Sequence, residues 1–174
     1  MKVLIIGIPG TGKSHLAEKM RRKNITAVDA DLFSGIVKLV DKYGRPLGYN
    51  SKDKAIRAEG DGIDVFNLRT LASLLKENDP LYVFTFTVEG QKGRKNGVLD
   101  IMKLFDKVYY LKASASVIKH RLKTRSSNGY GKKPSEVKQV MWSKREWDAK
   151  AEKLGLKAVS ATLPAEEIIK IITS

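Results

Sequence analysis

Gly7-Ile8-Pro9-Gly10-Thr11-Gly12-Lys13-Ser14 stands near the start of the chain, directly after an apolar run at residues 3–6. Leu16, Ala17 and Met20 follow it at the spacing of an amphipathic helix. The pattern G-x-x-x-x-G-K-S/T, between a buried strand and a helix, is that of a P-loop. The sequence therefore predicts a site for the phosphate groups of a nucleoside triphosphate.

The residue types in this loop suit phosphate binding. Glycines allow backbone conformations that a side chain would forbid, so successive N–H groups can turn toward a phosphate chain. The start of the following helix adds free N–H groups and the positive end of its dipole. Lys13, which we expect in an exposed loop, supplies a cation for the β- and γ-phosphates, and Ser14 supplies a hydroxyl ligand for Mg²⁺. The predicted ATP contacts here are Gly7, Pro9, Gly10, Thr11, Gly12, Lys13, Ser14 and His15.

The composition is that of one soluble globular domain spanning residues 1–174, with 42% hydrophobic and 30% charged residues. No apolar run approaches the length of a membrane span, and no signal peptide fits before the first strand. The chain contains no cysteine, which excludes disulfides and thiolate metal sites. We therefore expect a cytoplasmic protein without membrane contact, as a monomer or homodimer.

The net charge is strongly positive. The chain has 33 Lys and Arg against 19 Asp and Glu, a formal net charge of +14. Such an excess can reflect binding to nucleic acid or to small phosphorylated ligands. It can equally reflect a lysine-rich proteome that keeps its proteins soluble. The lysines are scattered along the whole chain, which favours the second explanation.

Apolar strands and helical segments alternate along the chain. We expect strands at residues 3–6, 25–28, 81–88, 108–111 and 158–160. Helices are expected at 13–23, 99–104 and 135–154, after Ser114 or Ser116, and after Pro164. Near-continuous apolar strands separated by helices predict an α/β fold, with a parallel five-stranded sheet covered by helices on both faces.

Two further helices are expected between the second and third strands. Apolar residues recur at helical spacing over residues 32–40 and again over 65–75. The polar stretch between them is hard to assign. We expect this largely helical segment, about residues 32–79, to bind the second substrate.

Carboxylates lie where two of the predicted strands end. Asp29 and Asp31 follow the second strand, and Glu89 follows the third. Ligands of parallel sheets bind beyond the carboxyl ends of the strands. Asp29 could hold a water of the Mg²⁺ shell, and Asp31 could orient or deprotonate the acceptor hydroxyl. Alternatively, Asp31 caps the next helix, and Glu89 competes for either role.

The order of these motifs resembles that of the small P-loop kinases, the group of adenylate kinase, shikimate kinase and gluconate kinase. The P-loop begins within the first ten residues, and Asp29-Ala30-Asp31 matches the Asp-x-Asp of shikimate-type kinases. Arg121-Leu122-Lys123-Thr124-Arg125 is similar to the R-x-x-x-R that opens the lid of nucleoside monophosphate kinases. A glycine-bearing segment, residues 126–134, follows it and corresponds to the lid.

This resemblance implies transfer of the γ-phosphate of Mg-ATP to a hydroxyl or phosphate acceptor. Arg121 would pack against the adenine or the phosphates, and Arg125 would meet the transferring group. Since the two arginines are four residues apart on one helical face, both can reach one phosphate chain. The implied catalytic residues are Lys13, Asp31 and Arg125, with Ser14 and Asp29 on the metal.

The sequence also departs from the group. It lacks the Asp-Gly-Phe-Pro-Arg of adenylate kinases and the triple glycine of shikimate kinases, so the acceptor cannot be read. Three functions stay open: a kinase of a small molecule, nucleoside or nucleotide; a polynucleotide 5′-hydroxyl kinase; and an ATP-binding or ATPase regulatory module with little transfer activity.

Overall fold

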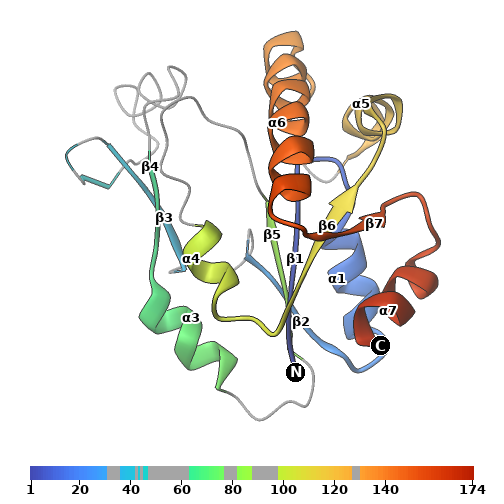
Figure 1. Ribbon diagram of the computed structural model, residues 1–174. Coiled ribbons are helices and arrows are strands. Elements are labelled where there is room, and N and C mark those ends of the chain that lie inside the picture. Colours follow the sequence, from blue (N-terminus) through green and yellow to red (C-terminus); the bar gives the residue numbers. More distant parts are fainter. Residues whose placement is uncertain are drawn as a thin grey trace.

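Five parallel strands form the central sheet of the protein (Figure 1). The computed structural model describes residues 1–30, 36–41, 43, 45–46, 63–76, 82–87, 98–126 and 130–174. Across the sheet, the order is β2 (Thr26–Asp29), β5 (Tyr82–Thr87), β1 (Lys2–Gly7), β6 (Lys107–Lys112) and β7 (Lys157–Ser160). The central strand β1 is buried along Val3–Gly7, and its Ile5 pairs with Thr85 on one side and Tyr109 on the other.

Helices cover both faces of this sheet. Neighbouring side chains of a strand point to opposite faces. The Tyr109 hydroxyl on β6 donates to the Ile171 carbonyl oxygen of α7 at 3.3 Å, whereas that of Tyr110 donates to Asp148 of α6 at 2.9 Å. Because α1 contacts α7, α1 lies on the Tyr109 face. The described helices are α1 (Lys13–Arg21), α3 (Leu68–Leu75), α4 (Val98–Met102), α5 (Ala115–Thr124), α6 (Pro134–Lys153) and α7 (Ala165–Thr173).

Two strands outside the central sheet, β3 (Val37–Val40) and β4 (Ile63–Phe66), pair antiparallel with each other. They lie in the segment that we predicted to be largely helical. The helix predicted over residues 32–40 is wrong at 37–40. The one predicted from Val65 begins only at Leu68, where the Asn67 side chain accepts the Thr70 N–H. Short runs of β-branched residues fit both periodicities, and here pairing between the two runs favours strands. Residues 32–35, 42, 44, 47–62 and 77–79 of the predicted segment lie outside the described residues.

The connection from α5 to α6 is tethered at both described ends. The Lys132 amine donates to the carbonyl oxygens of Lys123 and Arg125, at 2.6 and 2.7 Å. The Glu136 carboxylate accepts the N–H groups of Gly131 and Lys133. Pro134, placed in the predicted lid, is the first residue of α6. The described part of this connection shows no lid, and residues 127–129 lie outside it.

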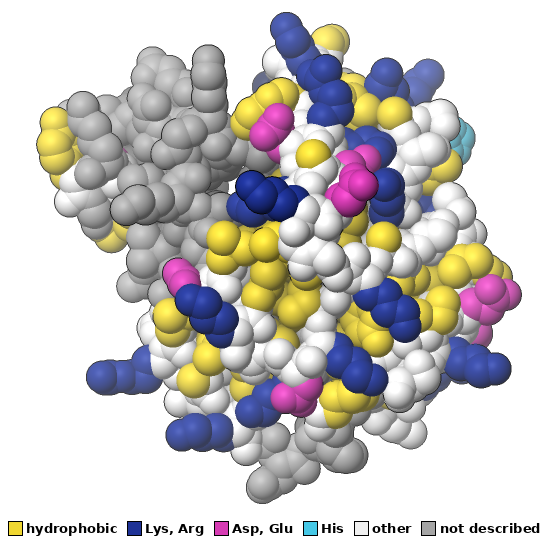
Figure 2. Space-filling model, viewed as in Figure 1, with side chains coloured by type: hydrophobic (Ala, Val, Ile, Leu, Met, Phe, Trp, Pro, Cys, Tyr) yellow, Lys and Arg dark blue, Asp and Glu magenta, His cyan; other side chains and the backbone are white. Residues whose placement is uncertain are grey.

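Charge is dispersed over the described part of the face that Figure 2 shows. Lys and Arg side chains are spread over the described part of the face in Figure 2, with acidic side chains between them. No helix in the described part of the chain is long and apolar enough to span a membrane.

Candidate functional site

The P-loop connects β1 to α1 and fits closely against its surroundings. Gly10 has a φ of +85°, in the left-handed region that favours glycine, and a Cβ there would lie 3.2 Å from Ile118 of α5. A Cβ on Gly7 would lie only 2.8 Å from the Thr11 Oγ1 atom. The tight turn and the close approach of α5 therefore explain two of the glycines.

Lys13 is the first residue of α1 and is buried, with 5% of its surface exposed. Our expectation of an exposed loop residue is therefore wrong. The chain folds the amine back over the P-loop, where Nζ donates to the Ile8 carbonyl oxygen at 3.1 Å. Thr11 Oγ1 donates to the same oxygen at 2.9 Å. The lysine charge is thus held inside the curve of the loop, and Ser14 next to it is exposed.

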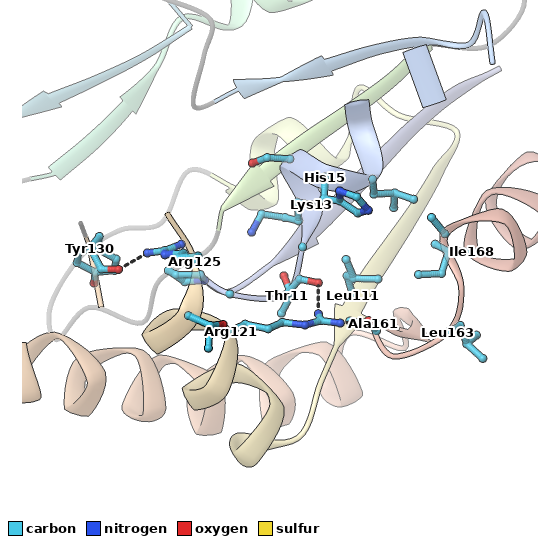
Figure 3. Close-up of a pocket in the computed structure, with 17 residues that line it drawn as sticks. Thr11, Lys13, His15, Leu111, Arg121, Arg125, Tyr130, Ala161, Leu163 and Ile168 are labelled. Carbon is cyan, nitrogen blue, oxygen red and sulfur yellow. Dashed lines mark hydrogen bonds between the residues drawn. The ribbon is translucent and has the colours of Figure 1, made fainter. Parts of the chain in front are cut away.

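Arg121 links the P-loop to the far side of the pocket. Its Nη1 donates to the Thr11 carbonyl oxygen at 3.1 Å, and its Nη2 donates to the Ala161 carbonyl oxygen at 2.8 Å. Figure 3 shows the guanidinium between these two residues. Both contacts join segments far apart in the sequence, so Arg121 has a positioning role that its motif alone does not indicate.

Arg125, which caps the C-terminal end of α5, is held by the Tyr130 carbonyl oxygen (Figure 3). Its Nε–H is buried and has no hydrogen-bond partner among the described residues. Burial lowers the pKa of its guanidinium below its ordinary value, while Tyr130 and Glu136 oppose this shift. Arginine stays protonated even so, and the group is therefore a partly desolvated cation.

These elements enclose one pocket of about 740 Å³. The P-loop and the start of α1 line one end of it, and α5 lines a side. The other end is apolar and comes from the C-terminal ends of β6 and β7 and from the start of α7. The pocket residues are Pro9, Gly10, Thr11, Gly12, Lys13, Ser14, His15, Leu16, Leu111, Arg121, Thr124, Arg125, Tyr130, Ala161, Leu163, Ala165 and Ile168.

The structure brings together nearly all of the residues predicted to bind the nucleotide. Every one of them lines this pocket except Gly7, which ends β1 directly below the loop. Sequence reasoning missed the apolar end, which has no motif. The rule that ligands bind beyond the carboxyl ends of parallel strands points to its residues that follow β6 and β7.

The predicted carboxylates are only partly placed. Asp29 ends β2, has 4% of its surface exposed and pairs in register with Thr85 of β5. It does not line the pocket of the described residues. Asp31 and Glu89 lie outside the described residues.

The described residues around the pocket offer a magnesium ion few protein ligands. No group of three or more His, Asp or Glu side chains lies together among the described residues. The exposed Ser14 hydroxyl in the pocket fits a Mg²⁺ held mainly by the oxygens of a nucleotide, which is how Mg²⁺ is usually bound beside phosphates.

Comparison with known proteins agrees with this geometry. Residues 3–142 match the family model AAA_18, described as an AAA domain. No curated protein gives a significant match.

Solved structures similar to this chain include several kinases. A shikimate kinase from Aquifex aeolicus vf5 has a TM-score of 0.54 and 19% identity, over 99% of this chain and 94% of that chain. A gluconokinase from Sinorhizobium meliloti 1021 has a TM-score of 0.54 and 16% identity, over 97% and 87%. A deoxyadenosine kinase from M. mycoides with bound dATP has a TM-score of 0.51 and 17% identity, over 99% and 97%. Such distant likeness shows the fold, and it confirms the resemblance to small P-loop kinases.

Proposed function

The chain belongs to the AAA_18 family of AAA domains, and from this premise we propose that it is an ATP-dependent phosphotransferase. It would move the γ-phosphate of Mg-ATP to a hydroxyl or phosphate of a small molecule, nucleoside or nucleotide. One observation carries the proposal: the P-loop, Lys13, Arg121 of α5 and Arg125 at the C-terminal end of that helix all line a single pocket. Phosphoryl transfer depends mainly on positioning and on neutralising charge, and this pocket supplies cations for both.

The residues of the pocket have distinct roles in this proposal. The N–H groups of the loop and of the first turn of α1 bind the phosphates, aided by the helix dipole. Lys13 exchanges its contact with the Ile8 oxygen for the β- and γ-phosphate oxygens. Arg125 is partly desolvated and bears an unsatisfied Nε–H, so an anion beside it gains a charge-assisted hydrogen bond. Arg125 therefore meets the transferring group.

Mg²⁺ would be held by the Ser14 hydroxyl and the phosphates, with Asp29 acting through a water of its shell. The ion would neutralise charge that develops on the phosphoryl oxygens. On the acceptor side, we propose Asp31 as the carboxylate that orients or deprotonates the acceptor, with Glu89 as its competitor. We also propose that residues 1–174 form one domain, in which residues 32–79 bind the acceptor and residues 126–134 serve as a lid.

Purified protein with Mg-ATP and a panel of acceptors tests the proposal. The panel contains hydroxy acids, sugars, nucleosides, nucleoside monophosphates and a 5′-hydroxyl oligonucleotide, and the readout is phosphorylated acceptor and ADP. Lys13→Met keeps the aliphatic chain but removes the charge, and it should abolish transfer. Lys119→Met on exposed α5 surface is the matched control and should leave turnover unchanged.

The outcomes separate the three functions. A phosphorylated small molecule or nucleotide supports the proposal, and product only with the oligonucleotide makes the chain a polynucleotide kinase. ATP binding without any acceptor product leaves a regulatory module. Full turnover in Lys13→Met would remove the basis of all three.

A further inference from the structure

A second cavity, of about 650 Å³, lies at the carboxyl ends of β6 and β7. Its polar lining consists of Lys112, Ser114, Lys144, Ser160 and Thr162, and no Asp or Glu of the described residues lines it. Ligands of parallel sheets bind at this edge, and the volume suits a small molecule. The cavity shares no residue with the nucleotide pocket.

The two cavities lie on opposite faces of the sheet. Neighbouring residues of a strand point to opposite faces, and Leu111 of β6 lines the nucleotide pocket while the adjacent Lys112 lines the second cavity. Lys112 pairs in register with Ser160 of β7. Tyr110, on the same face as Lys112, donates to Asp148 of α6. The second cavity therefore lies on the α6 face.

Both lysines of this cavity can donate to a ligand. The Lys144 amine pairs with one oxygen of Asp148, whose other oxygen accepts the Tyr110 hydroxyl at 2.9 Å. This pairing holds the Lys144 side chain, only 15% exposed, at the cavity wall. An amine has three N–H groups, so Lys144 keeps donors beyond the one used on Asp148. Lys112 is exposed and has no ion pair with another described residue. Two lysines against one carboxylate leave the cavity positive.

The loop after β7 adds a hydroxyl donor. The Ser160 and Thr162 hydroxyl oxygens are 2.8 Å apart, so one of the two groups donates to the other. The Ser160 hydroxyl also accepts the Thr162 N–H at 3.3 Å. Because each hydroxyl carries one hydrogen, the pair keeps one O–H for a ligand. Amines and hydroxyls together form charge-assisted hydrogen bonds with the oxygens of a phosphate.

We propose that this cavity is a second anion site of the protein, which binds inorganic phosphate or the phosphate group of a small ester and alters nucleotide affinity. The coupling follows from the loop after β7, which reaches both cavities. Ser160 and Thr162 line the anion site, whereas Ala161 and Leu163 line the nucleotide pocket (Figure 3). The Ala161 carbonyl oxygen also accepts Arg121 Nη2. By linkage, bound nucleotide changes phosphate affinity by the same factor.

Calorimetric titration of the wild-type protein tests the site. A saturating non-hydrolysable ATP analogue keeps the added phosphate out of the P-loop. Inorganic phosphate and glucose 6-phosphate are titrated separately, which distinguishes free phosphate from an ester. A dissociation constant of about 1 mM or tighter for either supports the site, and a lack of saturable binding for both overturns it. If the analogue itself does not bind, the proposed function fails, and the titration is repeated on Lys13→Met to weaken the P-loop instead.

Substitutions locate the bound phosphate. Thr162→Val keeps the shape of the side chain but removes its hydroxyl, and Lys112→Met removes a charge. Each should weaken phosphate binding by about tenfold, the usual effect of losing a hydrogen bond to a charged group. Lys119→Met on α5 is the matched control and should leave the affinity unchanged. All three side chains are exposed, so the fold should tolerate the changes. Wild-type affinity in both cavity variants would place the phosphate elsewhere.

A comparison of two proteins isolates the coupling. The dissociation constant of a fluorescent nucleotide is measured with and without phosphate, in wild type and in Thr162→Val. Direct competition at the P-loop is the same in both proteins, so a difference between their shifts reports the second site. We expect the shifts to differ by about fivefold or more at saturating phosphate. Identical shifts would overturn the coupling.

Discussion

Replacing Gly131 by alanine should destabilise the protein through one buried leucine. Gly131 has a φ of +84°, and a left-handed conformation costs an L-residue about 1–2 kcal/mol. The new Cβ would lie 2.7 Å from Leu122 Cδ2, and Leu122 is fully buried. Overpacking of this kind costs about 1–3 kcal/mol more. The free energy of unfolding should therefore fall by about 2–5 kcal/mol in total.

Gly155→Ala is the matched control. Gly155 also has a positive φ, +62°, but no atom of the described residues lies within 4 Å of the position of its Cβ. The free energy of unfolding of Gly155→Ala should fall only by the backbone contribution, about 1–2 kcal/mol. Thermal unfolding measures the stability of both variants. Each kcal/mol lost should lower Tm by roughly 2–4 °C in a chain of this size. Equal losses in the two variants would refute the packing argument.

The same substitution should also weaken nucleotide binding. Leu122 lies between Gly131 and the P-loop, since a Cβ on Gly10 would lie 3.3 Å from Leu122 Cγ. When the added methyl group displaces this leucine, the leucine presses on the loop that binds the phosphates. We expect a raised Kd for fluorescent nucleotide in Gly131→Ala and an unchanged Kd in Gly155→Ala. An unchanged Kd in both would show that Leu122 moves away from the loop.

Three further perturbations test other parts of the structure. The N–H groups of Lys133 and Gly131 hold the pKa of Glu136 below its ordinary 4.5, so its charged form stabilises the fold above that pH. Glu136→Ala should therefore lower Tm at pH 7, and its difference from wild type should narrow as the pH falls below 4.5, in a series of melts. Tyr110→Phe removes the hydrogen bond to the Asp148 carboxylate, and calorimetry should show a loss of about 1.5–3 kcal/mol. Asp29→Asn should raise the Mg²⁺ concentration needed for half-maximal transfer, and an unchanged requirement would remove it from the metal shell.

The phosphate end of the site could be predicted because its determinants are contiguous. Eight neighbouring residues specify the loop, and their conformations depend mainly on local glycines. The alternation of apolar strands and helices likewise predicted the α/β fold. Residues 37–40 and 65–66 were misassigned because each apolar run is too short for its period to decide, and the strands β3 and β4 form only by pairing with each other.

The burial of Lys13 and the bridging contacts of Arg121 depend on tertiary contacts that no local pattern contains. Arg121 matches a motif, yet its partners Thr11 and Ala161 are 110 and 40 residues away. These partners are carbonyl oxygens, which every residue carries, so side-chain identity could not reveal them. The same holds for the apolar end of the pocket, whose residues come from β6, from the loop after β7 and from α7 and form no motif.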